Sequence, residues 1–133
     1  MNHTRTCDDE AMRALAPALA LGALLGWWPS ALADPVFIDH VAWTNTPDGP
    51  SLHVFPTQAG RDAPADEQGE AWAEVLRLAP DADSPSMREQ FDCHQSFAKA
   101  KESWNLEPWR PVVGVAALLA SACNPGKKEG PQT

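Results

Sequence analysis

The sequence lacks the short motifs that mark the common catalytic and nucleotide-binding sites. It has no HExxH or HxH spacing for a metal, no GxSxG for a serine nucleophile, no Walker loop and no glycine-rich dinucleotide turn. It also has no tyrosine and only 3 cysteines in 133 residues. We therefore assign no catalytic residue, metal or cofactor from motifs, and the length favours a single domain.

Cationic side chains are scarce as well. The chain has 10 Lys and Arg against 18 Asp and Glu, a net charge of −8 with neutral histidines. Residues 34–133 alone keep a net charge of −7, from 8 cationic and 15 anionic side chains. Because an acidic domain repels phosphate polyanions, we expect neither a nucleic acid nor an anionic membrane as a partner.

No hydrophobic run reaches the length of a membrane-spanning helix. The longest run, Ala14–Trp28, has fifteen residues, whereas a spanning helix needs about 18 to 20. Ala31 and Ala33 follow with the small-x-small spacing that signal peptidase recognises. The pattern predicts a signal peptide over 1–33, cleaved after Ala33, and a secreted or extracytoplasmic protein with no stable membrane insertion after cleavage. An uncleaved anchor and a buried core helix are the alternatives.

The two ends of the chain carry further expectations. Residues 1–11 include three acidic side chains, which are unusual in the positively charged start of a signal peptide. This favours Met12 as the true start of translation, the alternative being a tolerated longer start. Residues 127–133 follow Pro125 and Gly126, and we expect them to form a disordered tail.

Export changes the interpretation of the cysteines. Cys7 lies in the segment to be removed, which leaves Cys93 and Cys123 as an even pair in an oxidising compartment. A disulfide between them closes a loop of about 31 residues and contributes roughly 3.7 kcal/mol in the chain-entropy model. Two such distant thiols do not form a CxxC motif, and a zinc site needs more ligands at suitable spacing.

The mature chain begins with a predicted β-hairpin. Val36–Thr44 and Ser51–Thr57 are rich in β-branched and aromatic residues, and "NTPDGP" between them has turn chemistry. Residues 58–69 are polar and read as a loop. Asp39 falls on the same side of its strand as Val41 and other apolar residues, so the strand is not cleanly one-sided.

Two helices are predicted next. The first, from Glu70 to Pro80, should turn inward Trp72, Val75, Leu76 and Ala79, with Glu70, Glu74 and Arg77 on the surface. Ser84 and Pro85 begin the second helix, which should run to about Lys99. Its expected apolar stripe is Met87, Phe91, His94 and Ala98, widened by Cys93 and Phe97, and its expected polar side is Arg88, Glu89, Asp92, Gln95, Ser96 and Lys99.

The last elements complete an α+β class. Ser103–Pro111 reads as an extended edge segment, because its prolines exclude a central strand. Val112–Cys123 reads as a short helix with one apolar face, formed by Val115, Leu118, Leu119 and Ala122. The order of elements predicts a small single α+β domain over 34–126, with a β-hairpin and a third extended strand packed on two or three helices, and one disulfide.

Several stretches together resemble a known family. They are "FIDHVAW", "AWAEVLRLAPDAD", "MREQFDCHQSFA", "WNLEPWRP" and "CNPG". The sequence resembles the uncharacterised family catalogued as domain of unknown function 2599, small exported proteins of GC-rich Gram-positive bacteria, over about Val36–Gly126. The resemblance implies that the two cysteines and most of "WNLEPWRP" belong to the family pattern, and it carries no catalytic residue across.

One trio has the residue types of an acid–base site. His94 provides a proton shuttle, Glu107 a second acid or base, and Arg110 a cation for developing negative charge. A small secreted hydrolase or toxin-like effector could use them. The alternative is that His94 is a helix histidine bonded to backbone, and that Glu107 and Arg110 form a structural pair.

The same stretch also offers candidate binding residues. Trp104 and Trp109 can stack on a sugar or grip a peptide, although covering the core is the more common role of such tryptophans. A metal held by His40 and His53 is disfavoured because nothing fixes their register. We therefore expect a non-catalytic binding or interaction module, at or outside the cell envelope, for an unknown protein, glycan or small ligand, with these candidate binding residues: His94, Trp104, Glu107, Trp109 and Arg110.

Overall fold

The computed structural model describes Gly26 and residues 32–126. Most of the predicted signal peptide, including Met12, and the predicted tail at 127–133 lie outside the described residues. Within the described part, the chain forms three strands, four α-helices and one 3₁₀ turn. The α+β class expected from the order of elements is confirmed.

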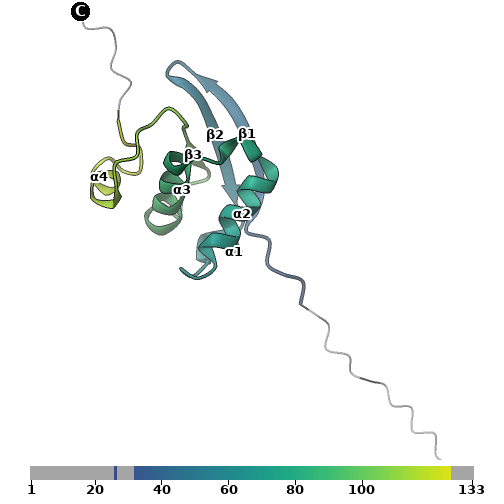
Figure 1. Cartoon of the computed structure of the whole chain (residues 1–133). Coiled ribbons are helices and arrows are strands. Elements are labelled where there is room, and N and C mark those ends of the chain that lie inside the picture. Colours follow the sequence, from purple (N-terminus) through teal and green to yellow (C-terminus); the bar gives the residue numbers. More distant parts are fainter. Residues whose placement is uncertain (1–25, 27–31, 127–133) are drawn as a thin grey trace, which may run out of the picture. The chain divides into compact units, whose positions relative to one another are not determined.

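The three strands form one antiparallel sheet in the order β1-β2-β3 (Figure 1). The first two strands make the expected hairpin around the turn Pro47–Asp48, and the third is an edge strand, as the prolines after it require. The strands are β1 (Ile38–Thr46), β2 (Gly49–Pro56) and β3 (Trp104–Leu106). The pairing shifts register between Ile38 and His40, so Asp39 is exposed while its neighbour Ile38 is buried.

The helices that pack on the sheet lie on one of its faces, and the last helix lies beside α3 (Figure 1). The helices are α1 (Gln58–Asp62), α2 (Gln68–Leu78), α3 (Pro85–Phe97) and α4 (Val115–Ala120), with a 3₁₀ turn at Pro80–Ala82. α3 begins where the sequence predicts, because the Ser84 hydroxyl accepts a hydrogen bond from the Met87 amide at 3.3 Å.

Helix α1 occupies a stretch that we predicted to be a loop. The Thr57 hydroxyl starts it by accepting a hydrogen bond from the Gly60 amide at 3.1 Å, and it also donates to the Phe37 carbonyl at 3.1 Å. A Cβ on Gly60 would lie only 2.1 Å from that carbonyl oxygen. Glycine is therefore required here, because α1 packs directly on the backbone that enters β1.

Glu74 was expected on the surface of α2, and this expectation is wrong. Its carboxylate accepts hydrogen bonds from the backbone amides of Phe37 and Ile38, at 2.9 and 2.8 Å, and its side chain is only 14% exposed. Arg77 lies 3.7 Å from the other carboxylate oxygen. Glu74 therefore holds the start of β1 against α2, a contact between residues 36 and 37 positions apart.

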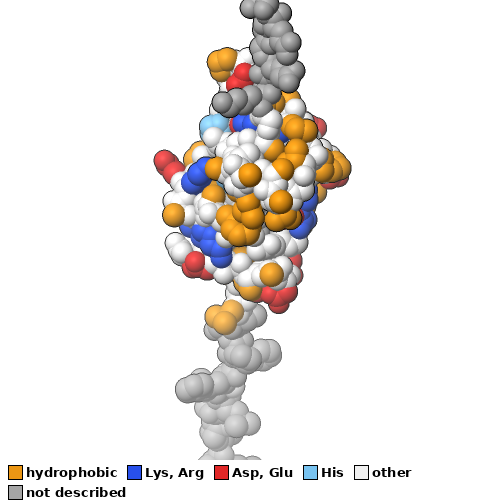
Figure 2. Space-filling model, turned by 90° about the vertical axis from the view of Figure 1, so that its left-hand side faces the viewer, with side chains coloured by type: hydrophobic (Ala, Val, Ile, Leu, Met, Phe, Trp, Pro, Cys, Tyr) orange, Lys and Arg blue, Asp and Glu red, His pale blue; other side chains and the backbone are white. Residues whose placement is uncertain are grey.

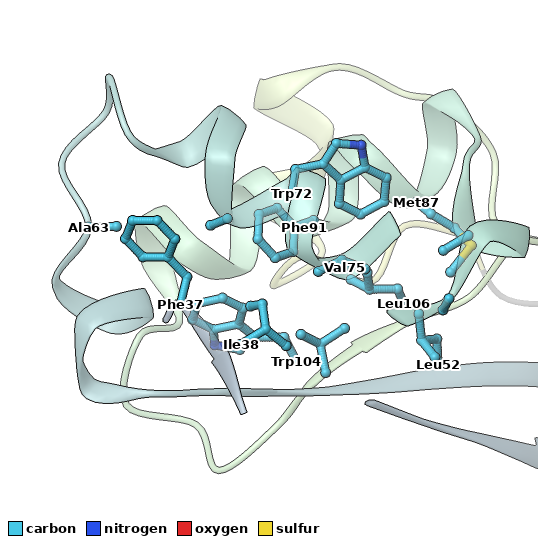
Figure 3. Close-up of a cluster of buried hydrophobic side chains, with 14 residues drawn as sticks. Phe37, Ile38, Leu52, Ala63, Trp72, Val75, Met87, Phe91, Trp104 and Leu106 are labelled. Carbon is cyan, nitrogen blue, oxygen red and sulfur yellow. The ribbon is translucent and has the colours of Figure 1, made fainter. Parts of the chain in front are cut away.

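The main hydrophobic core lies between the sheet and helices α2 and α3 (Figure 3). Phe91 is at its centre, with ring centroids 5.2 Å from Trp72 and 5.6 Å from Trp104. The buried members of this cluster are Phe37, Ile38, Leu52, Val54, Ala63, Ala71, Trp72, Val75, Ala79, Ala82, Met87, Phe91, Trp104 and Leu106.

The predicted apolar stripe of α3 is right in its first three turns and wrong at its end. Met87, Phe91 and His94 are buried, but Phe97 is 63% exposed. Gln95, assigned to the polar side, is fully buried and donates to the Gly60 carbonyl at 3.2 Å. A periodicity argument fails for Gln95 because α1, which it contacts, was not predicted.

The Cys93–Cys123 disulfide joins α3 to the chain after α4, with 5.6 Å between the Cα atoms. The two cysteines and Leu118 form a second, smaller buried cluster. Glu89 holds the entry to α4 by accepting hydrogen bonds from the amides of Val113 and Gly114, at 3.0 and 2.6 Å. α4 therefore starts at Val115 rather than at Val112, and the disulfide anchors its far end.

We expect loss of this disulfide to lower the stability of the whole domain. Replacing both cysteines by alanine should reduce the free energy of unfolding by about 2–5 kcal/mol, the usual penalty in a small disulfide-bonded domain. Chemical denaturation of the oxidised protein and of the Cys93→Ala/Cys123→Ala variant measures this difference. Alkylation of the unfolded, unreduced protein should leave peptides with Cys93 or Cys123 unlabelled, and a labelled Cys93 would contradict the bond.

Candidate functional site

Glu107, one of the candidate residues, lies at the centre of a buried polar network. Its side chain is 10% exposed and accepts a hydrogen bond from Arg110 Nε at 2.5 Å. The other carboxylate oxygen accepts from the Ser51 hydroxyl of β2 at 3.2 Å. Both oxygens of Glu107 are therefore used inside the fold. We call Ser51, Gln90, Glu107 and Arg110 the polar clamp.

Gln90 of α3 binds the backbone of the clamp as a neighbouring strand would. Its side-chain oxygen accepts from the Glu107 amide at 2.9 Å, and its side-chain nitrogen donates to the Glu107 carbonyl at 2.9 Å. Ser86, one turn earlier, donates to the Arg110 carbonyl at 2.6 Å. Helix α3 therefore holds the segment after β3 by side-chain contacts to its backbone.

Arg110 connects the clamp to the end of the described chain. Its NH1 group donates to the carbonyls of Pro125 and Gly126, at 3.1 and 2.6 Å, and its guanidinium lies 4.4 Å from the ring centroid of Trp109. Only 13% of its side chain is exposed. The cation is thus shared among internal acceptors and an aromatic face.

Trp109 packs on the hairpin turn. Its indole nitrogen donates to the Pro50 carbonyl at 3.2 Å, and a Cβ on Gly49 would lie 2.7 Å from its ring. Gly49 has φ of +139°, which glycine adopts most easily. Trp109 is therefore in contact with the turn that joins β1 and β2, although part of its surface stays exposed.

Trp104, the other candidate tryptophan, is fully buried in the main core. Its indole nitrogen donates to the Ala98 carbonyl at the end of α3, at 3.2 Å. The ring meets Phe91 edge-on. Because no surface of Trp104 is accessible, it packs the core and is not available to stack on a ligand.

His94 is a buried histidine bonded to its own helix. Only 1% of its surface is exposed, and Nδ1 lies 2.8 Å from the Gln90 carbonyl, so Nδ1 carries the proton. Burial lowers the pKa of His94 below its ordinary value and outweighs the bond to Gln90, which favours the protonated ring. His94 is therefore neutral at pH 7.

This lowered pKa predicts a loss of stability in acid. The unfolded chain binds a proton at His94 as the pH falls below about 6.5, whereas the folded chain resists it. The free energy of unfolding should therefore fall as the pH drops below that value and should change little above it. Denaturation of wild type and of His94→Asn, whose amide can replace Nδ1–H, should show a weaker acid dependence in the variant. An equal slope in both proteins would exclude His94 as the cause.

The hydrolase trio is not presented at an open cleft. His94 is close enough for the charges of Glu107 and Arg110 to affect its pKa, but all three side chains are buried or nearly so. The two hollows described below are lined by other residues. Among the described residues, no group of three or more histidine, cysteine and acidic side chains is placed to hold a metal ion.

One group of exposed apolar side chains lies elsewhere, on helices α3 and α4. Phe97, Val115 and Leu119 are 63%, 67% and 44% exposed, although the sequence predicts all three on inward faces. Figure 2, viewed from the α4 side, shows hydrophobic side chains across the middle of this surface and cationic ones at its borders. We call Phe97, Val115 and Leu119 the α3–α4 face.

Two adjoining hollows shape this face. The larger, of about 640 Å³, lies between the end of α3 and α4, and Phe97 and Leu119 both line it. The smaller, of about 160 Å³, is lined by Phe97, Val115 and Leu118, among others. Ser96 and Phe97 line both hollows. No helix of the described residues is long and apolar enough to cross a membrane.

Sequence reasoning missed the α3–α4 face, because it placed the apolar residues of a short helix in the core. A usable signal was present in α4 itself, whose residues are all apolar. A helix that is apolar all round leaves apolar surface exposed unless other elements cover every side of it. Only Leu118 of α4 is buried, so the other residues of this helix are exposed.

The fold and the clamp define a small disulfide-bonded α+β domain in which the polar side chains of Glu107 and Arg110 are used internally. The chain belongs to the family described as "Protein of unknown function (DUF2599)", whose model matches residues 38–126. It is similar to an uncharacterised protein of Mycobacterium tuberculosis (strain ATCC 25618 / H37Rv), 48% identical over 108 residues, covering 73% of this chain and 71% of the relative. It is also similar to an uncharacterised protein of Mycobacterium leprae (strain TN), 41% identical over 104 residues, covering 72% of this chain and 85% of the relative. No solved structure matches the chain.

Proposed function

We propose that this protein is an exported, non-catalytic binding module that contacts its ligand or partner through the α3–α4 face. The observation that carries the proposal is the exposure of Phe97, Val115 and Leu119 around two adjoining hollows. Exposed apolar side chains that gather in one place, rather than singly, mark sites of interaction.

The positions of the chemically reactive side chains support the non-catalytic part of the proposal. A general acid or base must reach the substrate within hydrogen-bond distance. His94 is 1% exposed, and the carboxylate of Glu107 is bonded to Ser51 and Arg110. Catalysis by this trio would require the polar clamp to open.

Export is part of the proposal and depends on the sequence of the first 33 residues. We expect cleavage after Ala33, because the apolar run ends in a small-x-small pattern. N-terminal sequencing of the protein recovered from the culture medium and the cell envelope should begin at Asp34. A protein that keeps its N-terminal segment and stays in the membrane would contradict export by a cleaved signal.

A pair of matched variants tests the binding surface. Leu119→Asp places a charge on the α3–α4 face, and Leu78→Asp places the same charge on α2, where Leu78 is 50% exposed. Immobilised mature protein, residues 34–133, is incubated with cell-envelope extract, and the retained proteins, glycans and small molecules are identified by mass spectrometry. We expect specific material retained by wild type and by Leu78→Asp to be lost with Leu119→Asp.

Two results would overturn the proposal. One is retention of the same material by all three proteins, which would place binding outside this face. The other is turnover of a substrate that disappears with His94→Asn while the protein stays folded, which would establish the hydrolase alternative. Thermal unfolding of each variant, measured first, separates lost binding from lost structure.

A further inference from the structure

The larger hollow has the size and lining of a site for a small apolar ligand. Its volume of about 640 Å³ falls within the range of roughly 300–1,000 Å³ typical of such sites. Phe97, from α3, and Leu119, from α4, contribute large apolar side chains to its lining. The lining residues are Ser96, Phe97, Ala98, Lys99, Ala100, Lys101, Leu119, Ala122 and Cys123.

The charged groups at this hollow are cationic, in a protein of net charge −8. Lys99 and Lys101 both line it and both are exposed. Within residues 32–126, neither ammonium group forms an ion pair with a carboxylate, and the hollow is lined by no acidic residue. The rim therefore complements an anion, while the walls complement a hydrocarbon.

Hydrogen bonds from Arg61 hold the backbone of the loop that carries the two lysines. The guanidinium of Arg61, in α1, donates hydrogen bonds to the carbonyls of Lys99 and Lys101 and, at 3.2 Å, to that of Glu102. These bonds use the backbone of the loop and leave both ammonium groups free to meet a ligand. A rim held in place loses less entropy when it binds.

We propose that the larger hollow binds a single-chain anionic amphiphile, with its hydrocarbon chain between Phe97 and Leu119 and its carboxylate at Lys99 and Lys101. This inference rests on the proposed function and names the ligand of the same face. A free amphiphile suits the site better than a bilayer, because an anionic bilayer would also meet the overall negative charge of the domain.

Laurate below its micellar concentration is the probe. Mature ¹⁵N-labelled protein, residues 34–133, is titrated with laurate, neutral dodecanol and cationic dodecyltrimethylammonium, and amide shifts are followed by NMR. We expect laurate to bind most tightly and to shift residues at the end of α3 and in α4. Higher salt should weaken laurate binding and leave dodecanol binding unchanged.

Variants test the cationic rim and the apolar lining of the hollow separately. Lys99→Gln/Lys101→Gln should weaken laurate binding by about three- to tenfold, as expected for loss of two exposed ion pairs, and leave dodecanol binding unchanged. Leu119→Asp should weaken binding of both. Arg77→Gln removes an exposed cation of α2 that lines neither hollow, and it should change nothing.

Several outcomes would overturn the inference: equal affinity for laurate and dodecanol, shifts that map away from α3 and α4, or unchanged laurate binding in the double lysine variant. Binding to phosphatidylglycerol vesicles without binding to free laurate would replace the amphiphile by a membrane surface. If laurate does not bind, but the Leu119→Asp and Leu78→Asp proteins still differ in the material that they retain, only the amphiphile inference is refuted. If those two proteins do not differ either, the proposed function falls with it.

Discussion

Glu107→Ala is expected to lower the free energy of unfolding by about 3–5 kcal/mol, the penalty for removing one partner of a buried ion pair. The substitution leaves the guanidinium of Arg110 without its carboxylate and the Ser51 hydroxyl without its acceptor. Both groups are largely buried, so water replaces these bonds poorly. Urea denaturation at pH 7, followed by tryptophan fluorescence, measures the loss.

An exposed ion pair of the same protein is the matched control. Arg88 and Asp92 lie 2.9 Å apart on α3, with side chains 39% and 41% exposed. Asp92→Ala should therefore cost less than about 1 kcal/mol. Equal losses for Glu107→Ala and Asp92→Ala would show that the polar clamp does not stabilise the fold.

Phe91→Ala is expected to have a similarly large effect, about 3–5 kcal/mol. The ring is fully buried between Trp72 and Trp104. Its removal loses apolar burial and leaves a cavity that two large indole rings cannot close without moving. The same denaturation experiment measures this loss.

Phe97→Ala is the control for Phe91→Ala on the same helix. Phe97 is 63% exposed, and a surface substitution of this kind should change the free energy of unfolding by less than about 0.5 kcal/mol. A loss for Phe97→Ala as large as that for Phe91→Ala would place Phe97 in the core and remove the α3–α4 face.

The elements that could be predicted from the sequence are those set by local chemistry. Ser84 and Pro85 define the start of α3, and the "NTPDGP" stretch defines the hairpin turn. The prolines near β3 correctly predicted that it is an edge strand. In each case the deciding residues lie within a few positions of the element that they define.

The misassigned residues depend on contacts between distant parts of the chain. Gln95 was assigned to the polar side of its helix, yet it is buried because the backbone of Gly60 provides a hydrogen-bond partner. Phe97, the last residue of α3, is apolar yet 63% exposed. Helical periodicity contains no information on such partners, which only the tertiary fold brings together.

The candidate site shows the same limit. The sequence identified Glu107 and Arg110 as a pair, which the structure contains, and raised the alternative of a scaffold role. It did not identify Lys99, Lys101 or Leu119 as neighbours, because the hollow that they line forms only when α4 packs beside the end of α3.

The most direct measurement compares Glu107→Ala with Leu119→Asp, in stability and in the envelope material that each retains. The test is made at a temperature below the unfolding midpoint of both proteins. We expect Glu107→Ala to be much less stable yet to retain the same material as wild type, and Leu119→Asp to be stable yet to retain none of it. The reverse result, a stable Glu107→Ala protein that has lost its partner, would make "WNLEPWRP" the functional site and contradict the scaffold role of the polar clamp.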